Sequence, residues 1–570
     1  MAKRVLLGID AGGTHTDAVL VSEEESFRVC AQAKEATRHD DLPTSITHVL
    51  TKLQAQAQAP DLLTKVTHVT LGTTLAVNAL VQGKVAPVGL LLAAGPGLAP
   101  ERFALGDYAV VPGGLDHRGT EVAPLDCDDL APTLAAWKAK GISHVCCVSK
   151  FSPRNPKHEQ AMAKLCEAMG FTVTMGHSLS GQLNFPRRIA TAWYNAAVHK
   201  LHASFADAVC ATLDAFSIHA QVRFLKADGG AILLDRSREE PVQSILSGPA
   251  ASVMGAMALR DLSKGTTILF DIGGTTTDMA VLVDGSPVLD RMGMLINNRR
   301  TLVRALAQSS IGVGGDSLIA CTEEGITTGP MRLGNAMAFG GEHPTLLDAL
   351  NVADATQDPS RGDCSRSLHG ITRLATKAGL SPEDLANQAI AHALTSIKNA
   401  WNTLAEHINA HPIYTLKALR ACQYLKPDAI LLVGGPAQCL AKRLEDTMHL
   451  PVLVPEASDV ANAIGCALTQ ATDILEIYAD SGKRLLKAPR LDYSEPLDRK
   501  ASLEHVRNRA IALLTDHLAS QGLDDVRVEV LEEDIFAVLD DYGSSSRDIR
   551  VTCQAVPGIL GRVNNAHCAL

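Results

Sequence analysis

The sequence predicts an α/β protein made of two related halves that face each other, with a small α+β unit at its C-terminal end. Three observations lead to this expectation. Short apolar runs of strand character alternate with helix-like segments along most of the chain, which is typical of α/β folds. An octad at residues 10–17 returns almost unchanged at residues 271–278. The length of 570 residues also exceeds what one hydrophobic core supports, so several structural units are expected.

The repeated octad reads DAGGTHTD in its first copy and DIGGTTTD in its second. An apolar run precedes each copy, VLLGI and TILF, and another follows it, AVLV and MAVLV. A strand, a Gly-Gly turn and a second strand form a β-hairpin. Dinucleotide fingerprints and P-loops place a helix after the glycine turn, so the octads predict neither of those motifs.

The segments between and after the hairpins have recognisable helix and strand patterns. NPKHEQAMAKLCEAMG has Pro near its start and Gly after its end, which predicts a helix, and ISHVCCVSKF has the character of a buried strand. A proline-containing polar break at residues 183–188 is the expected boundary between the halves. We therefore predict an N-terminal lobe over residues 1–185 and a second lobe over 186–482. Residues 483–570 are expected to form a polar linker and an α+β unit with the strands VRVEVL, IFAVLDD and DIRVTCQAV.

Composition excludes several classes of function. The net charge of −10 gives no basic surface for nucleic acid or an anionic membrane, so neither is expected as a partner. No apolar run approaches the roughly 18–20 residues of a membrane span. The 13 cysteines are scattered without a C-x-x-C pair, which favours reduced thiols over disulfides or a zinc site. A cytoplasmic location is the expectation.

The octads are suited to binding a polyphosphate from two sides. Glycines let backbone N–H groups approach a phosphate closely, and threonine hydroxyls add donors. The predicted phosphate-binding residues are Gly12, Gly13, Thr14, Thr16, Gly273, Gly274, Thr275 and Thr276. A carboxylate would repel phosphate directly, so we predict that Asp10 and Asp271 hold Mg²⁺, through water, and take part in catalysis. The alternative is that each octad is only a tight turn whose carboxylate binds its own backbone.

Two further glycine segments are candidates for the nucleotide site. In PDAILLVGGPAQCLAKRLEDTM, an apolar strand is followed by Gly434 and Gly435 and then by a helix, an arrangement that can receive a base or ribose. Gly248 lies in SGPAASVMGA, where small residues either approach the nucleotide or let two helices cross closely. Both interpretations of Gly248 stay open from the sequence.

In their order along the chain, these elements resemble the phosphate and adenosine motifs of the actin, sugar-kinase and Hsp70 ATPase superfamily. That resemblance implies two ribonuclease-H-like lobes with ATP in the cleft between them. The chain also contains the segments SILSGPAASVMGAM, VTLGTTLAVNALVQGK, SKFSPRNPKHEQ, PRRIATAWYNAAV, LKADGG, IGVGGDSLIA and TTGPMRLGNAMAFGGEHPTLLDAL. Through these segments, over roughly residues 4–475, it resembles the hydantoinase A/5-oxoprolinase family, which includes ATP-binding subunits of acetone and acetophenone carboxylases.

The family resemblance implies a reaction class. ATP phosphorylates a carbonyl oxygen of a small molecule, a cyclic amide, lactam or ketone, and the activated product is hydrolysed or carboxylated. It also implies a possible B-type partner subunit, or a homo-oligomer. We therefore expect an ATP-dependent hydrolase of cyclic amides. The alternatives are a carboxylase subunit, a small-molecule kinase with the same phosphate clamp, or a non-enzymatic nucleotide switch.

Four positions depart from the family pattern. Leu71 stands in place of a His, Asp316 in place of a Gly, His15 in place of a Phe, and LGNAMAFG lacks the usual Cys. These departures are expected around the acceptor side of the cleft. Asp316 is a candidate catalytic carboxylate there, and Arg332 is a candidate partner for its charge, although an ordinary turn aspartate is an open alternative. His343 and Asp348 either line the acceptor pocket or belong to a helix start.

Overall fold

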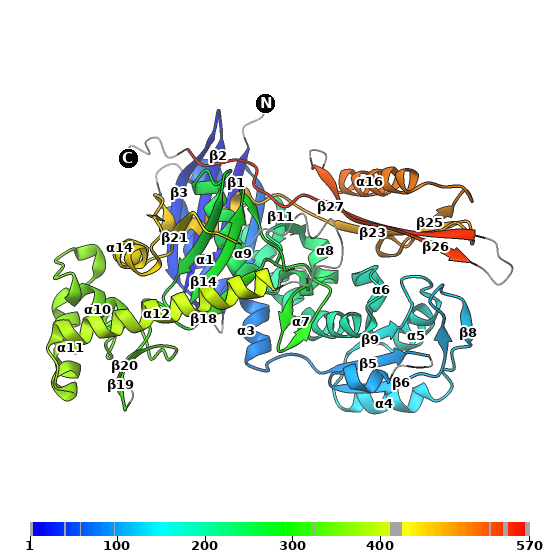
Figure 1. The fold of residues 1–570 in the computed structure, drawn as a ribbon, viewed down its shortest axis with the longest axis horizontal. Coiled ribbons are helices and arrows are strands. Elements are labelled where there is room, and N and C mark those ends of the chain that lie inside the picture. Colours follow the sequence, from blue (N-terminus) through cyan, green and yellow to red (C-terminus); the bar gives the residue numbers. More distant parts are fainter. Residues whose placement is uncertain are drawn as a thin grey trace.

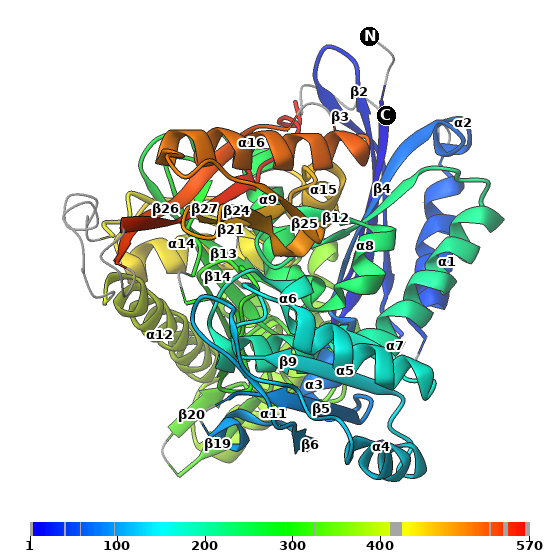
Figure 2. The ribbon, with the colours of Figure 1, turned by 90° about the vertical axis from the view of Figure 1, so that its right-hand side faces the viewer.

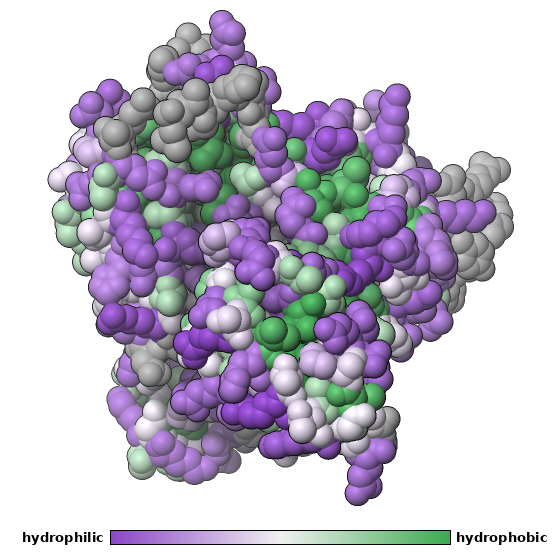
Figure 3. Space-filling view, turned by 90° about the vertical axis from the view of Figure 1, so that its left-hand side faces the viewer, coloured by the Kyte–Doolittle hydropathy of each residue, from purple (hydrophilic) through white to green (hydrophobic). Residues whose placement is uncertain are grey.

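The structure is a computed structural model and describes residues 4–564, apart from residues 39–40, 57–58, 96, 98, 291, 324, 411–424, 524–525 and 540–544. It is a mixed α/β protein, as predicted (Figure 1). Among the described residues, no helix combines the length and the apolar character needed to cross a lipid bilayer. Hydrophilic side chains dominate the face shown in Figure 3, and hydrophobic ones gather there only in small patches.

The first sheet is built around the first octad. Its strands, in spatial order, are β12 (Ala231–Leu233), β11 (Gln221–Leu225), β4 (Val66–Thr73), β1 (Val5–Ala11), β2 (His15–Glu23) and β3 (Phe27–Ala36). β1 and β2 form the predicted hairpin, the first hairpin below, and β1 runs parallel to β4. Every residue of β1 is buried, because helices cover both faces of the sheet. Two of these strands, β11 and β12, come from residues after the predicted boundary at 183–188, so the first sheet continues past it.

The second sheet repeats this arrangement around the second octad. Its strands, in spatial order, are β15 (Ser286–Pro287), β14 (Thr277–Val283), β13 (Thr266–Ile272), β21 (Ala429–Val433) and β22 (Val452–Leu453), with β18 (Gln308–Ile311) also on β14. β13 and β14 form the second hairpin, and β13 runs parallel to β21. Each sheet therefore places an antiparallel hairpin beside a parallel strand in the same spatial order.

Two short helices lie between the two sheets. α15 (Ala461–Leu468) packs on β1, β2 and β4, and α9 (Ser247–Leu259) packs on β13, β14 and β21 of the second sheet and on β4 and β11 of the first. A Cβ atom on Gly255 of α9 would lie 2.1 Å from the Ala461 carbonyl oxygen, and one on Gly465 of α15 would lie 2.2 Å from that of Ala251. The helices therefore cross backbone to backbone, which only glycine permits at these positions. A Cβ on Gly8 of β1 would likewise lie 1.9 Å from the Ala463 carbonyl oxygen, so α15 also rests directly on β1.

Other helices cover the outer faces. The first sheet packs against α1 (Leu42–Gln54) and the second part of α7 (Phe185–Ala215). The second sheet packs against α10 (Leu346–Ala353), α11 (Cys364–Ala378), α12 (Pro382–Asn409) and α14 (Ala437–Met448). α12 confirms the long helix expected in SPEDLANQAIAHALTSIKNAWNTLAEHI, and Ser381 caps it by accepting a bond from the Asp384 N–H.

A third sheet lies beside the first half of the molecule. It is entirely parallel, with the strands β10 (Thr172–Met175), β9 (His144–Ser149), β5 (Val88–Ala93) and β6 (Asp107–Val110). α4 (Leu130–Ala139) and α5 (Lys157–Ala168) cover one face, and the first part of α7 covers the other. Burial on both faces explains the continuous apolar run of β9 that the sequence shows.

The fourth sheet corrects the predicted C-terminal unit. Its strands are β25 (Tyr493–Pro496), β24 (Leu485–Ala488), β23 (Ile474–Asp480), β27 (Ser545–Ala555) and β26 (Val528–Leu539), and α16 (Leu503–Ser520) covers one face (Figure 2). The segment expected to be a polar linker contains β24 and β25. VRVEVL and the described part of IFAVLDD overlap the single strand β26, and residues 540–541 lie outside the described residues. The expected break at residues 532–534 lies within β26, next to a register shift between Val530 and Glu532. Buried and half-buried residues alternate along β24, and half-buried and exposed ones along β25.

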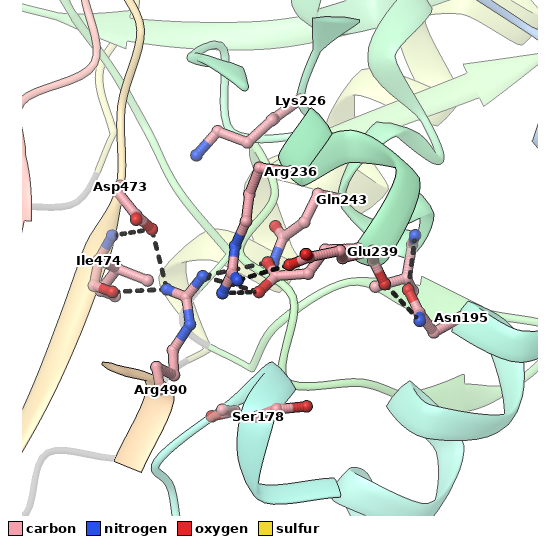
Figure 4. Close-up of polar contacts among 12 residues, drawn as sticks. Ser178, Asn195, Lys226, Arg236, Glu239, Gln243, Asp473, Ile474 and Arg490 are labelled. Atoms are coloured by element: carbon pink, nitrogen blue, oxygen red, sulfur yellow. Dashed lines mark hydrogen bonds and ion pairs between the residues drawn. The ribbon is translucent and has the colours of Figure 1, made fainter. Parts of the chain in front are cut away.

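Buried ion pairs join this unit to the rest of the molecule. Arg490 donates to Asp473 at 2.9 Å and to Glu240, at the end of α8 (Leu234–Glu239), at 3.0 Å. Arg236 of α8 also donates to Glu240. Figure 4 shows the Arg490 guanidinium between Asp473 and Arg236, with contacts to Asp473 and Ile474. We call these four side chains, Glu240, Asp473, Arg490 and Arg236, the ionic junction.

Smaller elements complete the description. The short helices are α2 (Ala59–Leu63), α3 (Leu75–Val81) and α6 (Gly176–Leu179), and the short strand pairs are β7 (Gly114–Leu115) with β8 (Glu121–Ala123), β16 (Leu295–Ile296) with β17 (Arg299–Arg300), and β19 (Ile319–Thr322) with β20 (Gly325–Thr328). After the fourth sheet the chain returns to the first one, where Val563 forms a bridge with Phe27.

Candidate functional site

A cavity of about 1470 Å³ lies between the first and second hairpins. Its walls come from both sheets, from α3, and from the first residues of α9 and α14. Nearly all residues predicted for the site line it, namely Asp10, Gly12, Gly13, Thr14, Gly248, Asp271, Gly273, Gly274, Thr275, Thr276, Asp316, Gly434 and Gly435. Segments more than 400 residues apart in sequence, from Asp10 to Gly435, therefore meet around one space.

The two hairpins have matching geometry. In the first, Asp10 pairs with Asp17 across the strands, and in the second Asp271 pairs with Asp278. The Gly12 N–H donates to the His15 carbonyl at 3.1 Å, and the Gly273 N–H donates to the Thr276 carbonyl at 2.9 Å. The repeated octad thus forms the same turn twice.

The turns also face each other. A Cβ atom on Gly274 of the second hairpin would lie 3.5 Å from the Thr14 methyl carbon of the first. Backbone N–H groups and hydroxyls of both turns are therefore available to a ligand held between them.

Asp10 is buried, and its carboxylate lacks part of the hydrogen bonding that would balance its burial. Only 5% of it is exposed, and its Oδ1 has no hydrogen-bond partner among the described residues. Burial raises the pKa of Asp10 to about 7, and the neighbouring carboxylate of Asp17 adds to this effect. A buried carboxylate oxygen without a partner is costly, so this atom is suited to a water molecule or a cation.

Asp271 is held by the two crossing helices. Ser252 of α9 donates its hydroxyl to Asp271 Oδ2 at 2.6 Å, and the Asn462 amide of α15 donates to the same oxygen at 3.2 Å. A Cβ on Gly434, whose φ is +97°, would lie 2.8 Å from Asp271 Oδ1, so glycine is required there for both conformation and space. Sequence reasoning missed Ser252 and Asn462, although both lie in small-residue helices with a central glycine.

The pKa of the second aspartate in each hairpin is also raised. Burial raises the pKa of Asp17 to about 7, although Lys34 opposes this with its ammonium group 3.4 Å away. Burial, reinforced by Asp271, raises the pKa of Asp278 to about 7. Both line the cavity, which therefore concentrates negative charge from four carboxylates.

Thr16 is the predicted site residue that does not line the cavity. It was predicted as a phosphate donor, but its side chain is fully buried and does not line the cavity. Its hydroxyl lies 3.0 Å from that of Thr37, with which it shares a hydrogen bond. Successive side chains of β2 point to opposite faces of the sheet. Thr16 therefore lies on the opposite face from His15 and Asp17, which line the cavity.

The two interpretations left open for Gly248 apply to two different glycines of α9. It lines the cavity in the first turn of α9, whereas Gly255 makes the crossing with α15. Ser247 fixes this end of the helix by donating to the Thr73 carbonyl at 3.0 Å. Leu246, just before the helix, has the left-handed φ of +64°, a strained conformation at the cavity wall. The helix N-terminus adds positive potential on this side.

The turn at Gly434 and Gly435 faces a wall that the sequence did not predict. This wall contains Asp354, Thr356, Asp358, Ser360 and Arg361, which follow α10. Arg443 of α14 binds Asp354 at 2.6 Å, and Arg361 binds it at 2.8 Å, so one carboxylate joins the two sides. Gln438, Cys439 and Lys442 of α14 also line this end, as do Ser458 and Asp459.

Asp316 lies beside the second hairpin and follows Gly315, where a Cβ would lie 3.0 Å from Pro436 of the Gly434 turn. A Cβ on Gly274 would lie 2.9 Å from its Oδ2. Arg332, the partner considered from the sequence, donates to that oxygen from Nη2 at 3.0 Å and from Nε at 3.3 Å. The Ala336 N–H donates to Oδ1 at 3.2 Å.

Three other positions expected near the acceptor side lie elsewhere. Leu71 is fully buried in the core of the first sheet and does not line the cavity. Asp348 forms a capping box with Thr345 at the start of α10, so the helix-start interpretation is correct. His343 is exposed and does not line the cavity, whereas His15 does.

The carboxylates fit a magnesium ion held through water. Among the described residues, no group of three or more His, Cys, Asp or Glu side chains has the arrangement of a direct metal site. Mg²⁺ keeps several waters and commonly uses one or two carboxylates together with substrate phosphates. Asp10, with its unpartnered Oδ1, and Asp271 are the side chains suited to this role.

Comparisons with known proteins agree over most of the chain. Residues 6–170 match the family model for the hydantoinase/oxoprolinase N-terminal region, and residues 188–474 match that for hydantoinase/oxoprolinase. The chain is similar to caprolactamase subunit alpha of Pseudomonas jessenii, with 24% identity over 81% of this chain and 70% of that protein.

Two other relatives extend the comparison. 5-Oxoprolinase 1 of Arabidopsis thaliana is 28% identical over 49% of this chain, which spans only 25% of that protein. The nucleotide-free structure of acetone carboxylase superimposes with a TM-score of 0.69 and 17% identity, over 97% of this chain and 88% of that one. This last similarity shows the fold.

Proposed function

The chain belongs to the hydantoinase/oxoprolinase family, and from this premise we propose that it is an ATP-dependent hydrolase of cyclic amides. ATP binds in the cavity, with its phosphates between the two hairpins and its adenosine between the Gly434 turn and the wall after α10. The observation that carries the proposal is the facing pair of identical turns, each with a buried aspartate, around one cavity.

The proposed reaction has two stages. The carbonyl oxygen of the amide attacks the γ-phosphorus, the bond to the β-phosphate oxygen breaks, and ADP leaves. One water then adds to the activated carbon, and cleavage of the ring C–N bond frees the amine and leaves an acyl phosphate. A second water hydrolyses the acyl phosphate to give the open amino acid and inorganic phosphate. The names of two relatives, a caprolactamase subunit and a 5-oxoprolinase, support a cyclic amide as substrate.

The chain's own residues supply positioning and electrostatics. The backbone N–H groups of Gly12, Gly13, Gly273 and Gly274, with the hydroxyls of Thr14, Thr275 and Thr276, bind the phosphate oxygens. Asp10 and Asp271 hold Mg²⁺, which supplies charge neutralisation on the phosphate oxygens when bound. Binding of a cation also relieves the repulsion among the four buried carboxylates.

We also propose a division into lobes. The common strand order of the first and second sheets supports two ribonuclease-H-like lobes of an actin-like ATPase fold. Because β11 and β12 belong to the first sheet, we place the end of the first lobe after β12, later than residue 185. The fourth sheet forms a separate C-terminal unit that begins at β23.

A second candidate is the ATP-binding component of a carboxylase. The fold similarity to acetone carboxylase, an enzyme of ATP-dependent acetone carboxylation, favours it. In either case a partner subunit is part of the proposal, since the caprolactamase relative is itself named as a subunit.

The test is ATP hydrolysis by the purified chain in the presence of Mg²⁺ and candidate acceptors. Lactams, hydantoins, 5-oxoproline and ketones, with and without bicarbonate, form the panel. Ring opening in step with ADP release supports the hydrolase, and bicarbonate-dependent ketone consumption supports the carboxylase. A stable phosphorylated product identifies a kinase. Slow ATP hydrolysis that no acceptor or candidate partner subunit changes indicates a nucleotide switch, and absence of Mg·ATP binding refutes all four.

A further inference from the structure

Asp316 is placed where the phosphoryl group would be transferred. Its N–H donates to the Gly274 carbonyl at 2.6 Å, and its carboxylate lies over the same glycine. Gly274 in turn faces Thr14 of the first hairpin. The carboxylate therefore lies at the end of the cavity where the two turns meet.

The charge of this carboxylate is compensated from behind. Asp316 lines the cavity, whereas Arg332, which contacts its Oδ2 at 3.0 Å, does not. Arg332 is fixed in turn by the Asn335 side chain at 3.2 Å. An uncompensated carboxylate would repel the phosphates, but a carboxylate paired with a guanidinium adds little net charge. Asp316 therefore presents to the cavity a hydrogen-bond acceptor whose charge is neutralised by Arg332.

Each carboxylate oxygen keeps capacity for another donor. Oδ1 accepts one bond, from the Ala336 N–H, and Oδ2 accepts from Arg332. A carboxylate offers about four lone-pair positions, so a donor from a ligand can still be received.

The surroundings suit a ring with apolar edges. Leu347 and Phe339 line the same cavity, and the Leu347 N–H donates to the carbonyl of Gly315, next to Asp316. Val77 and Val81 of α3 line it from the first half. The N–H and C=O groups of a ring amide lie on the same edge, because ring closure holds the amide cis. A ring whose N–H binds Asp316 therefore directs its carbonyl oxygen toward the Gly274 turn.

We propose that Asp316 accepts the ring N–H of the substrate and so restricts the enzyme to cyclic amides with a free N–H. The inference rests on the proposed function, because it places the acceptor at the phosphate end of an ATP site. Ketones lack the N–H, and N-alkylated lactams place a methyl group against the carboxylate. Sites built to bind an N–H discriminate strongly against analogues without it, because a polar group is then left unpaired.

The experiment compares a lactam with its N-methyl derivative and with the cyclic ketone of the same ring size. The full chain is saturated with Mg²⁺ and the non-hydrolysable analogue AMPPNP, and affinities are measured by calorimetry and ligand-observed NMR. We expect the unsubstituted lactam to bind at least about 10-fold more tightly than either analogue. Asp316→Ala should reduce that ratio to less than about threefold, and Asp316→Asn, which keeps the shape, should give an intermediate ratio.

The chain offers a matched control in Asp290→Ala. Asp290 pairs with Arg300 at 2.7 Å, its side chain is 14% exposed, as is that of Asp316, and it does not line the cavity. Its replacement should leave the ratio unchanged.

Three outcomes overturn the inference while AMPPNP still binds. These are equal binding of the lactam and its N-methyl derivative, an unchanged ratio in Asp316→Ala, and a loss of Mg·AMPPNP affinity in that variant without a change in ratio. The last would assign Asp316 to the metal. Failure of the wild-type chain to bind Mg·AMPPNP refutes the proposed function itself, and this inference with it.

Discussion

The cavity and the ionic junction both bury several acidic side chains, yet they treat the charge in opposite ways. At the junction, Glu240 lies between two guanidinium groups, and Arg490 holds the pKa of Asp473 well below its usual value in spite of burial. In the cavity, burial raises the pKa of Asp10 to about 7, and the charge that affects this pKa most is another carboxylate, that of Asp17.

This difference separates two uses of a buried carboxylate. Paired carboxylates at the junction need nothing more and hold structural units together. Carboxylates left short of positive charge need a cation from outside, so they mark the place where a metal and its nucleotide are expected. Changes at the ionic junction should therefore lower stability, whereas changes at the cavity carboxylates should lower activity.

The largest expected effect is on turnover. Asp10→Asn should lower ATP turnover roughly 1000-fold, because metal neutralisation of phosphoryl oxygens is worth several kcal/mol. Its unfolding free energy should not fall, since the change removes an under-compensated buried charge. Steady-state ADP release and thermal unfolding check the two parts. Near wild-type turnover would mean that the octads are only turns.

The next effect is on stability alone. Arg490→Met should lower the unfolding free energy by about 3 kcal/mol, because it leaves Glu240 and Asp473 buried without their shared partner. Turnover per folded molecule should be unchanged. Urea unfolding measures this, with Arg509→Met as the control. Arg509 pairs with Glu495 in the same unit, but the pair is partly exposed, so its loss should cost less than about 1 kcal/mol. Equal losses in both variants would contradict the comparison.

A smaller, pH-dependent effect is expected at Asp278. Its raised pKa means that the folded state holds the proton more tightly than the unfolded state, so this group lowers stability as the pH rises from about 4 to about 7. Asp278→Asn removes that dependence. The variant should be more stable than the wild type by about 2 kcal/mol at pH 8, and the difference should shrink toward pH 4. Nucleotide-free and metal-free unfolding at several pH values tests this, and a constant difference would exclude the charge as its cause.

The smallest effect should come from Thr16→Val. Because Thr16 is buried and its hydroxyl is bonded to Thr37, the variant should lose about 1 kcal/mol of stability and keep its affinity for Mg·ATP within about twofold. Thr14→Val, at a residue that lines the cavity, provides the contrast. Calorimetric titration of both variants decides whether binding is confined to the residues that line the cavity.

Local sequence patterns predicted what depends on local geometry. The octads predicted both hairpins, because a glycine turn and its flanking apolar runs determine structure within a few residues. The N-cap and the apolar periodicity of α12 predicted that helix in the same way. Most of the residues predicted for the site line the cavity. Thr16 was the exception, because side-chain alternation along β2 turns it away.

Long-range features could not be read in the same way. Ser252 and Asn462 reach Asp271 only because α9 and α15 cross at glycines. The sequence of either helix does not indicate which other helix it crosses. β24 and β25 looked like a linker because each has only four residues and both lie among polar residues and prolines. The wall at Asp354 depends on Arg443, which lies almost 90 residues further along the chain.

The crossing of α9 and α15 has a mechanical consequence. β1, which carries Asp10, rests on the backbone of α15, and Asp271 is bonded to both helices. With no side chains between them at the contact, the helices can swivel more readily than they can separate. For rotation about such a pivot, displacement grows with distance from the axis. The two aspartates lie near the axis, whereas the wall after α10 lies further out. A nucleotide could then enter and leave through a large opening at the rim while the carboxylates keep almost the same spacing, like the jaws of a clamp that open widely at the tips and hardly at the hinge.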